Sequence, residues 1–173
     1  MSSDQQSDFQ ALNIAILTVS DTRDLSNDTS GEFLAKAITS DGHQLIDRQL
    51  VIDDIYQLRA IVSTWIADNR IQAIITTGGT GFTARDSTPE ALQPLFDKNI
   101  PGFGELFRQL SYDKIGTSTV QSRCVAGMSN RTLIACLPGS TGACKDAWYG
   151  ILQQQLDSRY RPCNFVMHLS QPA

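Results

Sequence analysis

The sequence predicts an α/β fold, a three-layer sandwich with a mostly parallel sheet and helices on both faces. Short apolar runs rich in branched residues suit strands buried on both faces, and these runs alternate with segments whose apolar positions recur at helical spacing. Such alternation gives parallel strands joined by right-handed crossovers. A length of 173 residues, 41% of them hydrophobic, suits one compact domain. We therefore expect a flexible tail over residues 1–12 and a single domain over residues 13–173.

The first expected strand covers residues 13–20 (NIAILTVS), and a polar, turn-rich segment follows it. Thr29 and Glu32 then have capping-box spacing just ahead of apolar positions. This pattern predicts a helix that ends at Gly42.

Residues 43–52 are expected to form the second strand, and apolar positions at helical spacing predict a helix over residues 55–66. Trp65 lies on the apolar side of this helix, which favours a place in the core. Residues 71–77 (IQAIITT) predict a third buried strand.

In the second half, Pro89 follows a Ser-Thr pair, which is typical of a capped helix start, and Pro94 is expected to kink or shorten that helix. Another helical stretch is expected around residues 104–110. Residues 132–137 (TLIACL) predict a fourth strand, and the turn after it leads into a helix that ends at about Leu156.

Composition excludes several classes of protein. A formal net charge of -4 argues against a protein that coats nucleic acid, because that role needs a basic face. No apolar run approaches the roughly 20 residues of a membrane span, and the first residues do not form a signal peptide, so we expect a cytoplasmic protein. The four cysteines form no CxxC pair, which favours buried thiols over a metal site.

The segment GGTG at the end of the third strand allows several interpretations. A nucleotide P-loop is excluded, because Phe82 and Thr83 follow Gly81 where lysine and a hydroxyl residue are needed. A dinucleotide loop, and with it a nicotinamide-dependent reductase, fits poorly because the next helix begins too late. Two interpretations remain open: a backbone cradle for an anion or a flat base, and a tight turn without a ligand.

Acidic residues leave two of the predicted strands. Asp53 and Asp54 follow the second strand, and Asp86 follows the glycines. Ligands of parallel sheets bind at the carboxyl ends of the strands, where these side chains are expected to converge. Paired carboxylates at such a site suit magnesium bound to a polyphosphate.

Three segments carry a resemblance: residues 76–91 (TTGGTGFTARDSTPEA), 101–111 (PGFGELFRQLS) and 137–148 (LPGSTGACKDAW). They resemble the MogA and MoaB proteins of molybdenum cofactor biosynthesis and the related domains of plant and animal molybdopterin-binding proteins. Residues 28–31 (DTSG) and 161–165 (RPCNF) favour the MoaB branch. The resemblance covers nearly the whole chain.

The resemblance implies an enzyme that transfers adenylate from Mg-ATP to the terminal phosphate of molybdopterin and releases pyrophosphate. It implies that Asp53 and Asp86 are the catalytic acids and hold Mg²⁺, and Asp54 is the alternative to Asp53. A non-catalytic molybdopterin carrier of the same pathway is the alternative function.

The resemblance also implies binding residues. Those expected near the nucleotide are Ser20, Asp21, Gly78, Gly79, Thr80 and Gly81. Those expected near the pterin and its phosphate are Ser111, Ser118, Pro138, Gly139 and Ser140. Ser140 equally suits a simple helix cap, and Arg85 and Lys145 are candidate phosphate partners.

The family resemblance implies partners as well. A downstream molybdenum-insertion protein would receive the product, and the chain would assemble as a homotrimer or homohexamer. Such assembly would bury the apolar segment at residues 164–169 (NFVMHL), although packing within one chain would bury it equally well.

Overall fold

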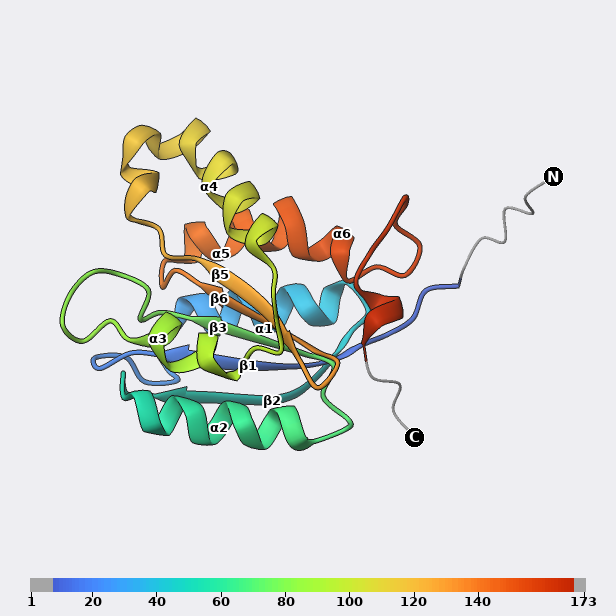
Figure 1. Cartoon of the computed structure of the whole chain (residues 1–173), viewed down its shortest axis with the longest axis horizontal. Helices are drawn as coiled ribbons and strands as arrows, with labels where there is room; N and C mark the ends of the chain where they lie inside the picture. The colour runs from blue at the N-terminus through green and yellow to red at the C-terminus, as the bar shows by residue number, and fades with distance from the viewer. Residues whose placement is uncertain (1–7, 170–173) are drawn as a thin grey trace.

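The computed structural model describes residues 8–169, and Figure 1 shows a twisted sheet between two layers of helices. Six strands form the sheet in the order β2-β1-β3-β6-β5-β4. The four parallel strands are β1 (Asn13–Val19), β2 (Gln44–Val51), β3 (Ala73–Thr77) and β6 (Thr132–Leu137). The strand β5 (Val125–Ser129) pairs antiparallel with β6 on one side and with the short edge strand β4 (Lys98–Asn99) on the other. This architecture confirms the predicted fold class.

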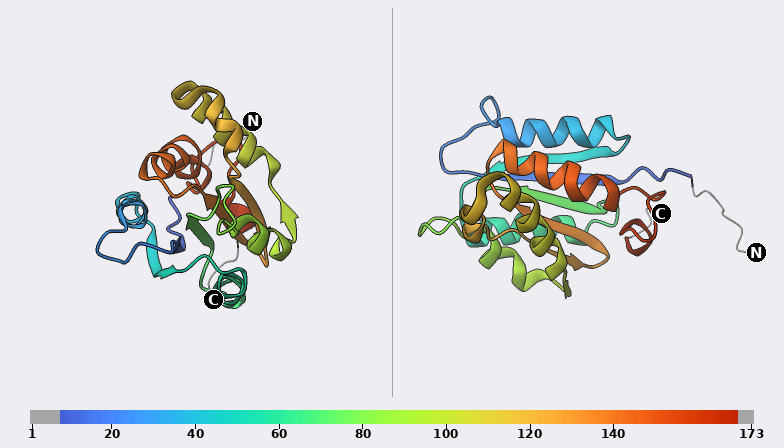
Figure 2. Two further views of the ribbon diagram at one scale, coloured as in Figure 1. Left: turned by 90° about the vertical axis from the view of Figure 1, so that its left-hand side faces the viewer. Right: turned by 90° about the horizontal axis from the view of Figure 1, so that it is seen from above.

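Helices cover both faces of the sheet, as predicted. The helices are α1 (Thr29–Ser40), α2 (Ile55–Ala67), α3 (Thr88–Leu92), α4 (Pro101–Ile115), α5 (Thr141–Ala147) and α6 (Gln153–Gln155). Short 3-10 turns are η1 (Gln93–Leu95), η2 (Gly116–Gln121) and η4 (Val166–His168), and a π-helical segment, η3 (Trp148–Leu152), joins α5 to α6. The helices α1 and α5 lie side by side over one face (Figure 2).

Two hydrophobic clusters make the core, one on each face. Side chains alternate along a strand, so Ile14 and Ile16 of β1 pack against α1, α4 and α5, whereas Ala15 and Leu17 pack against α2 and α3. Trp65 is buried in the second cluster, as its position on the apolar side of α2 predicts.

The helix starts differ from the prediction in two places. The N-cap of α1 is Asp28, whose side chain accepts from the Gly31 N–H, so the Thr29 capping box is wrong. Ser87 precedes α3 but makes no cap bond, because its hydroxyl donates to the Asp53 carboxylate instead. The α3 helix ends at Leu92, before Pro94, which confirms that it is short.

The chain ends pack closely in the part that the structure describes. Residues 1–7 of the predicted tail lie outside it, but Leu12 is fully buried, so packing begins before residue 13. Val166 and Leu169 pack into the core of their own chain. Within residues 8–169, no helix has the length and apolar character that crossing a bilayer requires.

Candidate functional site

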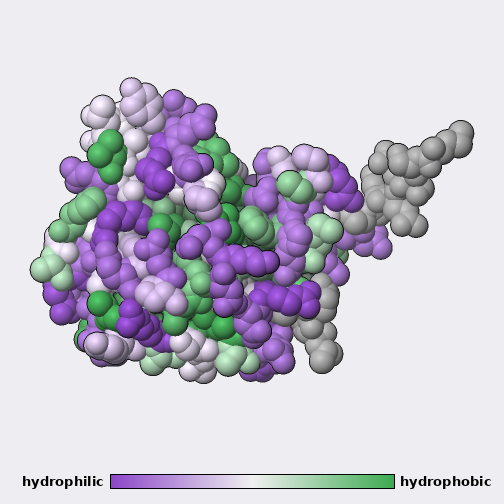
Figure 3. Space-filling model, in the orientation of Figure 1, coloured by the Kyte–Doolittle hydropathy of each residue, from purple (hydrophilic) through white to green (hydrophobic). Residues whose placement is uncertain are grey.

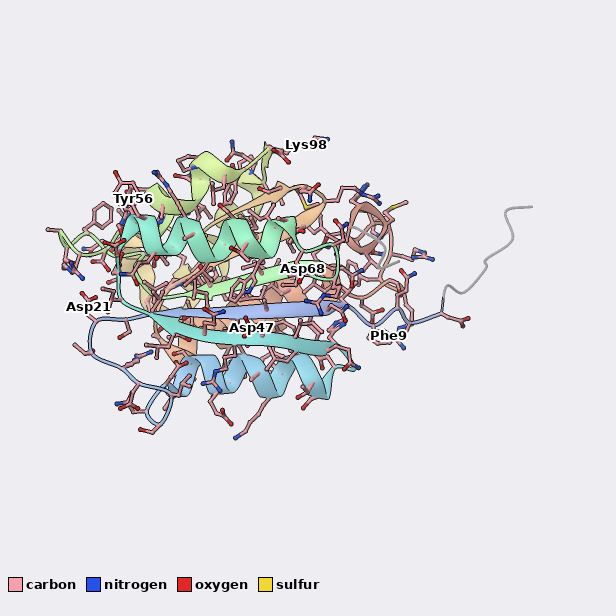
Figure 4. The ribbon with its side chains drawn as sticks, turned by 90° about the horizontal axis from the view of Figure 1, so that it is seen from below. Phe9, Asp21, Asp47, Tyr56, Asp68 and Lys98 are labelled. Carbon is pink, nitrogen blue, oxygen red and sulfur yellow. The ribbon has the colours of Figure 1, made fainter. Side chains whose placement is uncertain are left out.

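A cleft of about 970 Å³ lies at the carboxyl ends of the parallel strands. Its lining comes from the loops after β1, β2, β3 and β6 and from α4, α5 and η2. The predicted site residues that line it are Ser20, Asp21, Asp53, Gly78, Gly79, Thr80, Gly81, Asp86, Ser111, Ser118, Pro138, Gly139 and Ser140. Figure 4 shows Asp21 at this end of the sheet and Phe9 at the other. The structure thus brings these residues together in one cleft, and Asp54, the alternative to Asp53, is the candidate that lies outside its lining.

The segment Gly78–Gly81, the glycine ledge, continues directly from β3. Gly78 has φ +105° and Gly79 has φ +66°, a region that favours glycine. A Cβ on Gly78 would lie 2.1 Å from the Val19 carbonyl oxygen, and one on Gly79 would lie 2.4 Å from Asp53 Oδ2. Backbone conformation and close packing therefore both require glycine here.

Asp53 lies beside the ledge, just beyond the end of β2. Its carboxylate accepts hydrogen bonds from the N–H and hydroxyl groups of Ser87, and its own N–H donates to Asp21 Oδ1 at 2.9 Å. Burial raises the pKa of the Asp53 carboxyl, the Ser87 hydrogen bonds oppose this, and the negative charges of Asp21 and Asp86 raise the pKa further. No Lys or Arg of residues 8–169 forms an ion pair with it. Asp53 is therefore a buried carboxylate without an ion-pair partner among these residues, and the nearby Arg85 is paired with Asp21.

Asp86 lies at the other end of the ledge. Its Oδ2 accepts from the Thr83 hydroxyl at 2.6 Å and from the Thr83 N–H at 2.8 Å, and the hydroxyl is the main cause of a lowered carboxyl pKa. A Cβ on Gly81 would lie 2.7 Å from Asp86 Oδ2. Two carboxylates thus flank the ledge, each in contact with one of its glycine positions.

Asp54, the alternative to Asp53, has a structural role. Its side chain accepts from the N–H groups of Tyr56 and Gln57 and is the N-cap of α2. Asp53, and not Asp54, belongs to the lining of the cleft.

Asp21 and Arg85 form an ion pair across the mouth of the cleft. Arg85 Nε lies 2.8 Å from Asp21 Oδ2, and Arg85 Nη2 lies 2.9 Å from Oδ1. The hydrogen bond from Arg85 lowers the pKa of Asp21 to about 2. Arg85, a predicted phosphate partner, is thus held by an acid in this structure.

The other half of the cleft contains hydroxyl groups from three elements. Ser111 of α4 is buried, Ser118 lies in η2, and Ser140 accepts from the Ala143 N–H as the N-cap of α5. Ser140 therefore caps α5, and its predicted role toward the pterin phosphate stays a prediction. Lys145 lines the cleft too, with its ammonium 5.7 Å from the centre of the Phe33 ring.

Sequence reasoning missed several charged residues of the lining. Arg23 donates to the Gly139 carbonyl at 3.1 Å, and Lys114 pairs with Asp146. Arg23 is separated from Gly139 by 116 positions and Lys114 from Asp146 by 32. Arg23 lies within the predicted strand-end segment SDTRD, which was the one available signal.

Comparison with known proteins identifies the family. Residues 15–158 match the MoCF_biosynth family, described as a probable molybdopterin binding domain. Molybdenum cofactor biosynthesis protein B of Escherichia coli K12 is 52% identical over 162 residues, which are 94% of this chain and 95% of that protein. The Staphylococcus epidermidis protein of the same name is 44% identical over 149 residues, 84% of this chain and 85% of that protein.

A solved structure agrees with these sequence matches. The crystal structure of a molybdenum cofactor biosynthesis protein B has a TM-score of 0.82 and 36% identity, and the match covers 85% of this chain and 92% of that one. The sequence and structural matches therefore show that the chain belongs to the MoaB/MogA family of molybdenum cofactor biosynthesis proteins.

Proposed function

We propose that the protein transfers adenylate from Mg-ATP to the terminal phosphate of molybdopterin. One observation carries the proposal: a ledge with three glycines lies between two carboxylates, in a cleft that extends to Ser111 of α4, Ser118 of η2 and Ser140 at the start of α5. Its volume of about 970 Å³ is at the upper end of the range for single-ligand pockets. The cleft is therefore large for a single small ligand.

The acids beside the ledge suit magnesium that arrives with the nucleotide. Mg²⁺ is usually held by one or two carboxylates together with substrate phosphates and waters. Residues 8–169 contain no group of three or more His, Cys, Asp or Glu side chains placed to hold a metal by themselves. Asp53 and Asp86 fit the first description, since both line the cleft beside the ledge, and burial together with the negative charges of Asp21 and Asp86 raises the pKa of Asp53. When bound, magnesium would neutralise charge on the triphosphate.

The proposed reaction joins two anions, so the chain contributes mainly position. A terminal phosphate oxygen of molybdopterin forms a bond to the α-phosphorus of ATP, and the bond from that phosphorus to the bridging oxygen breaks. Pyrophosphate leaves with the bonding electrons. The ledge would hold the nucleotide, while Ser111, Ser118 and Ser140 would orient the pterin phosphate.

One observation favours a second function, a carrier of molybdopterin without turnover. Asp53 and Asp86 already accept hydrogen bonds from Ser87 and Thr83, which gives both acids a structural role without any metal. A carrier would bind molybdopterin tightly and would not depend on Asp86.

The two functions are separated by turnover. Purified protein is incubated with molybdopterin, ATP and Mg²⁺, and pyrophosphate and adenylylated pterin are measured. The enzyme proposal expects both products in equal amounts. Tight molybdopterin binding with no adenylylated pterin under any common divalent cation would contradict it and support the carrier.

Self-assembly belongs to the same proposal. Figure 3 shows apolar surface beside α4, and Leu106, Tyr112 and Ile115 of that helix are large apolar residues that are 41%, 57% and 54% exposed. Exposed apolar patches are typical of interaction sites. We expect a homotrimer or homohexamer that hands its product to a molybdenum-insertion protein. Equilibrium sedimentation checks the assembly, and a stable monomer at micromolar concentration would contradict it.

A further inference from the structure

We propose that Arg123 is the positioning residue of the glycine ledge, a role that rests on the proposed nucleotide site. Arg123 lies between η2 and β5, and its side chain is 21% exposed. Among the described residues, it is not part of the lining of the cleft. Its effect on a bound nucleotide would therefore be indirect, through the ledge and through Asp86.

The guanidinium of Arg123 holds the ledge by its carbonyl groups. Nε donates to the Gly81 oxygen at 2.8 Å and to the Thr80 oxygen at 3.3 Å. Nη2 donates to the Asp86 carbonyl at 3.0 Å. One rigid group thus connects the end of the ledge to the residue that carries the second carboxylate.

Two further contacts fix the guanidinium itself. Nη1 pairs with Glu90 of α3, and the guanidinium carbon lies 5.2 Å from the centre of the Phe82 ring. The planar fork of arginine presents several N–H groups in fixed directions, whereas a lysine ammonium is a single point charge. Lysine keeps the charge at this position but loses the simultaneous contacts to three carbonyls.

The geometry has a direct consequence for the nucleotide. The ledge is useful only if its backbone and the Asp86 carboxylate keep a fixed spacing, and Arg123 donates both to the carbonyl groups of the ledge and to the backbone carbonyl of Asp86. Pre-ordering a binding loop raises affinity because less freedom is lost on binding. Arg123→Lys should therefore weaken nucleotide binding while leaving the pterin half of the cleft intact.

Arg59 provides a matched control. Its guanidinium donates to the carbonyl groups of Ala91 at 3.0 Å and Glu90 at 3.1 Å, and it lies 5.9 Å from the centre of the Tyr56 ring. The chemistry is the same as that of Arg123, but these contacts hold the end of α3 and not the ledge. Arg59→Lys reports the cost of losing such an arginine elsewhere.

The test compares R123K, R59K and the unsubstituted protein by two measurements. Amide hydrogen exchange over residues 80–86 should become about tenfold faster in R123K, and Mg-ATP affinity should fall about tenfold, the change expected from losing one charge-assisted hydrogen bond. Molybdopterin affinity and the thermal unfolding midpoint should change no more than in R59K. Equal behaviour of R123K and R59K, or an equal loss of both ligands with a lower midpoint, would overturn the proposal.

Two outcomes, the absence of nucleotide binding and a failure of R123K to fold, each need a further measurement. If the unsubstituted protein binds no nucleotide, the proposed function fails, and the exchange rates alone decide whether Arg123 holds the ledge. If R123K does not fold, Glu90→Gln replaces it, because Glu90 is half-exposed and its loss frees only Nη1. E90Q should speed exchange over residues 80–86 about twofold to threefold, and unchanged exchange would overturn the proposal.

Discussion

The two ends of the sheet differ in how their charged side chains are paired. At the amino end, Phe9 packs against His43, Arg159 lies over Phe9, and Asp157 pairs with Arg159. At the carboxyl end, Asp53 is buried and forms no ion pair within residues 8–169, and it lies beside glycines in conformations that other residues rarely adopt. One end satisfies its own charges and contacts, and the other has chemistry that a ligand would complete. Local strain and unbalanced charge of this kind are common at functional sites.

The largest expected effect is on turnover at the carboxyl end. Asp86→Ala should lower the rate of adenylylated pterin formation by about a hundredfold or more, because charge on the triphosphate is no longer neutralised. Asp54→Asn is the control, since asparagine preserves the cap of α2. A transfer rate in D86A within threefold of that in D54N would show that Asp86 is not required for adenylate transfer.

The next effect tests whether the ledge requires glycine. Gly79→Ala places a Cβ 2.2 Å from Thr88 Oγ1 at φ +66°, so it should destabilise the protein by about 1–3 kcal/mol and abolish nucleotide binding. Gly102 of α4 is the control, because a Cβ atom added to it would have nothing within 4 Å. Gly102→Ala should stabilise the protein by up to about 1 kcal/mol. Urea unfolding measures both, and equal effects would show that the ledge is an ordinary turn.

A smaller effect is expected at the amino end, where the stability of the fold should depend on pH through His43. Burial lowers the pKa of His43 against the opposing charges of Asp41 and Asp157, and Nδ1 accepts the Leu12 N–H. The folded state therefore binds the proton less well than the unfolded state. Stability should fall as the pH drops below about 6.5, with a slope of at most about 1.4 kcal/mol per pH unit.

The substitution His43→Asn tests this linkage, because asparagine keeps an acceptor for Leu12 and does not titrate. Urea unfolding between pH 7.5 and pH 5 should show a flatter stability profile, by up to the same slope of about 1.4 kcal/mol per pH unit. His168→Asn, at an exposed position, is the matched control. A profile as steep in H43N as in the parent would show that His43 is not the acid-sensitive group.

The smallest effect is expected on thermal stability when the charge of Asp53 is removed. Asp53→Asn retains an acceptor for Ser87 but removes the negative charge, and it should raise the thermal unfolding midpoint at pH 7 by roughly 2 °C. Because the pKa of Asp53 is raised on folding, the penalty exists above that pKa and disappears as the pH falls through it. The difference between the two proteins should therefore shrink toward about pH 4. A lower midpoint in D53N at pH 7 would contradict a shortage of positive charge at Asp53.

The features that could be predicted from the sequence are those that depend on residues close together in the chain. The parallel strands depend on local runs of branched residues, and the acids and glycines lie at strand ends, so both were predictable. The antiparallel pair was not: Lys98–Asn99 has no apolar pattern, and Gly127 of β5 is required by Phe96, 31 positions away. The α1 cap was mispredicted because Asp28 is held by Thr18 and by Arg48, 10 and 20 positions away.

We propose that Asp53 and Asp86 together hold magnesium on a triphosphate above the ledge. Titration calorimetry of ATP, with and without Mg²⁺, compares the parent protein with a D53N/D86A double variant. Mg²⁺ should raise the ATP affinity of the parent by about tenfold or more, and this gain should vanish in the double variant while molybdopterin binding persists. A double variant that binds Mg-ATP with the affinity of the parent would show that the two acids do not hold the ion.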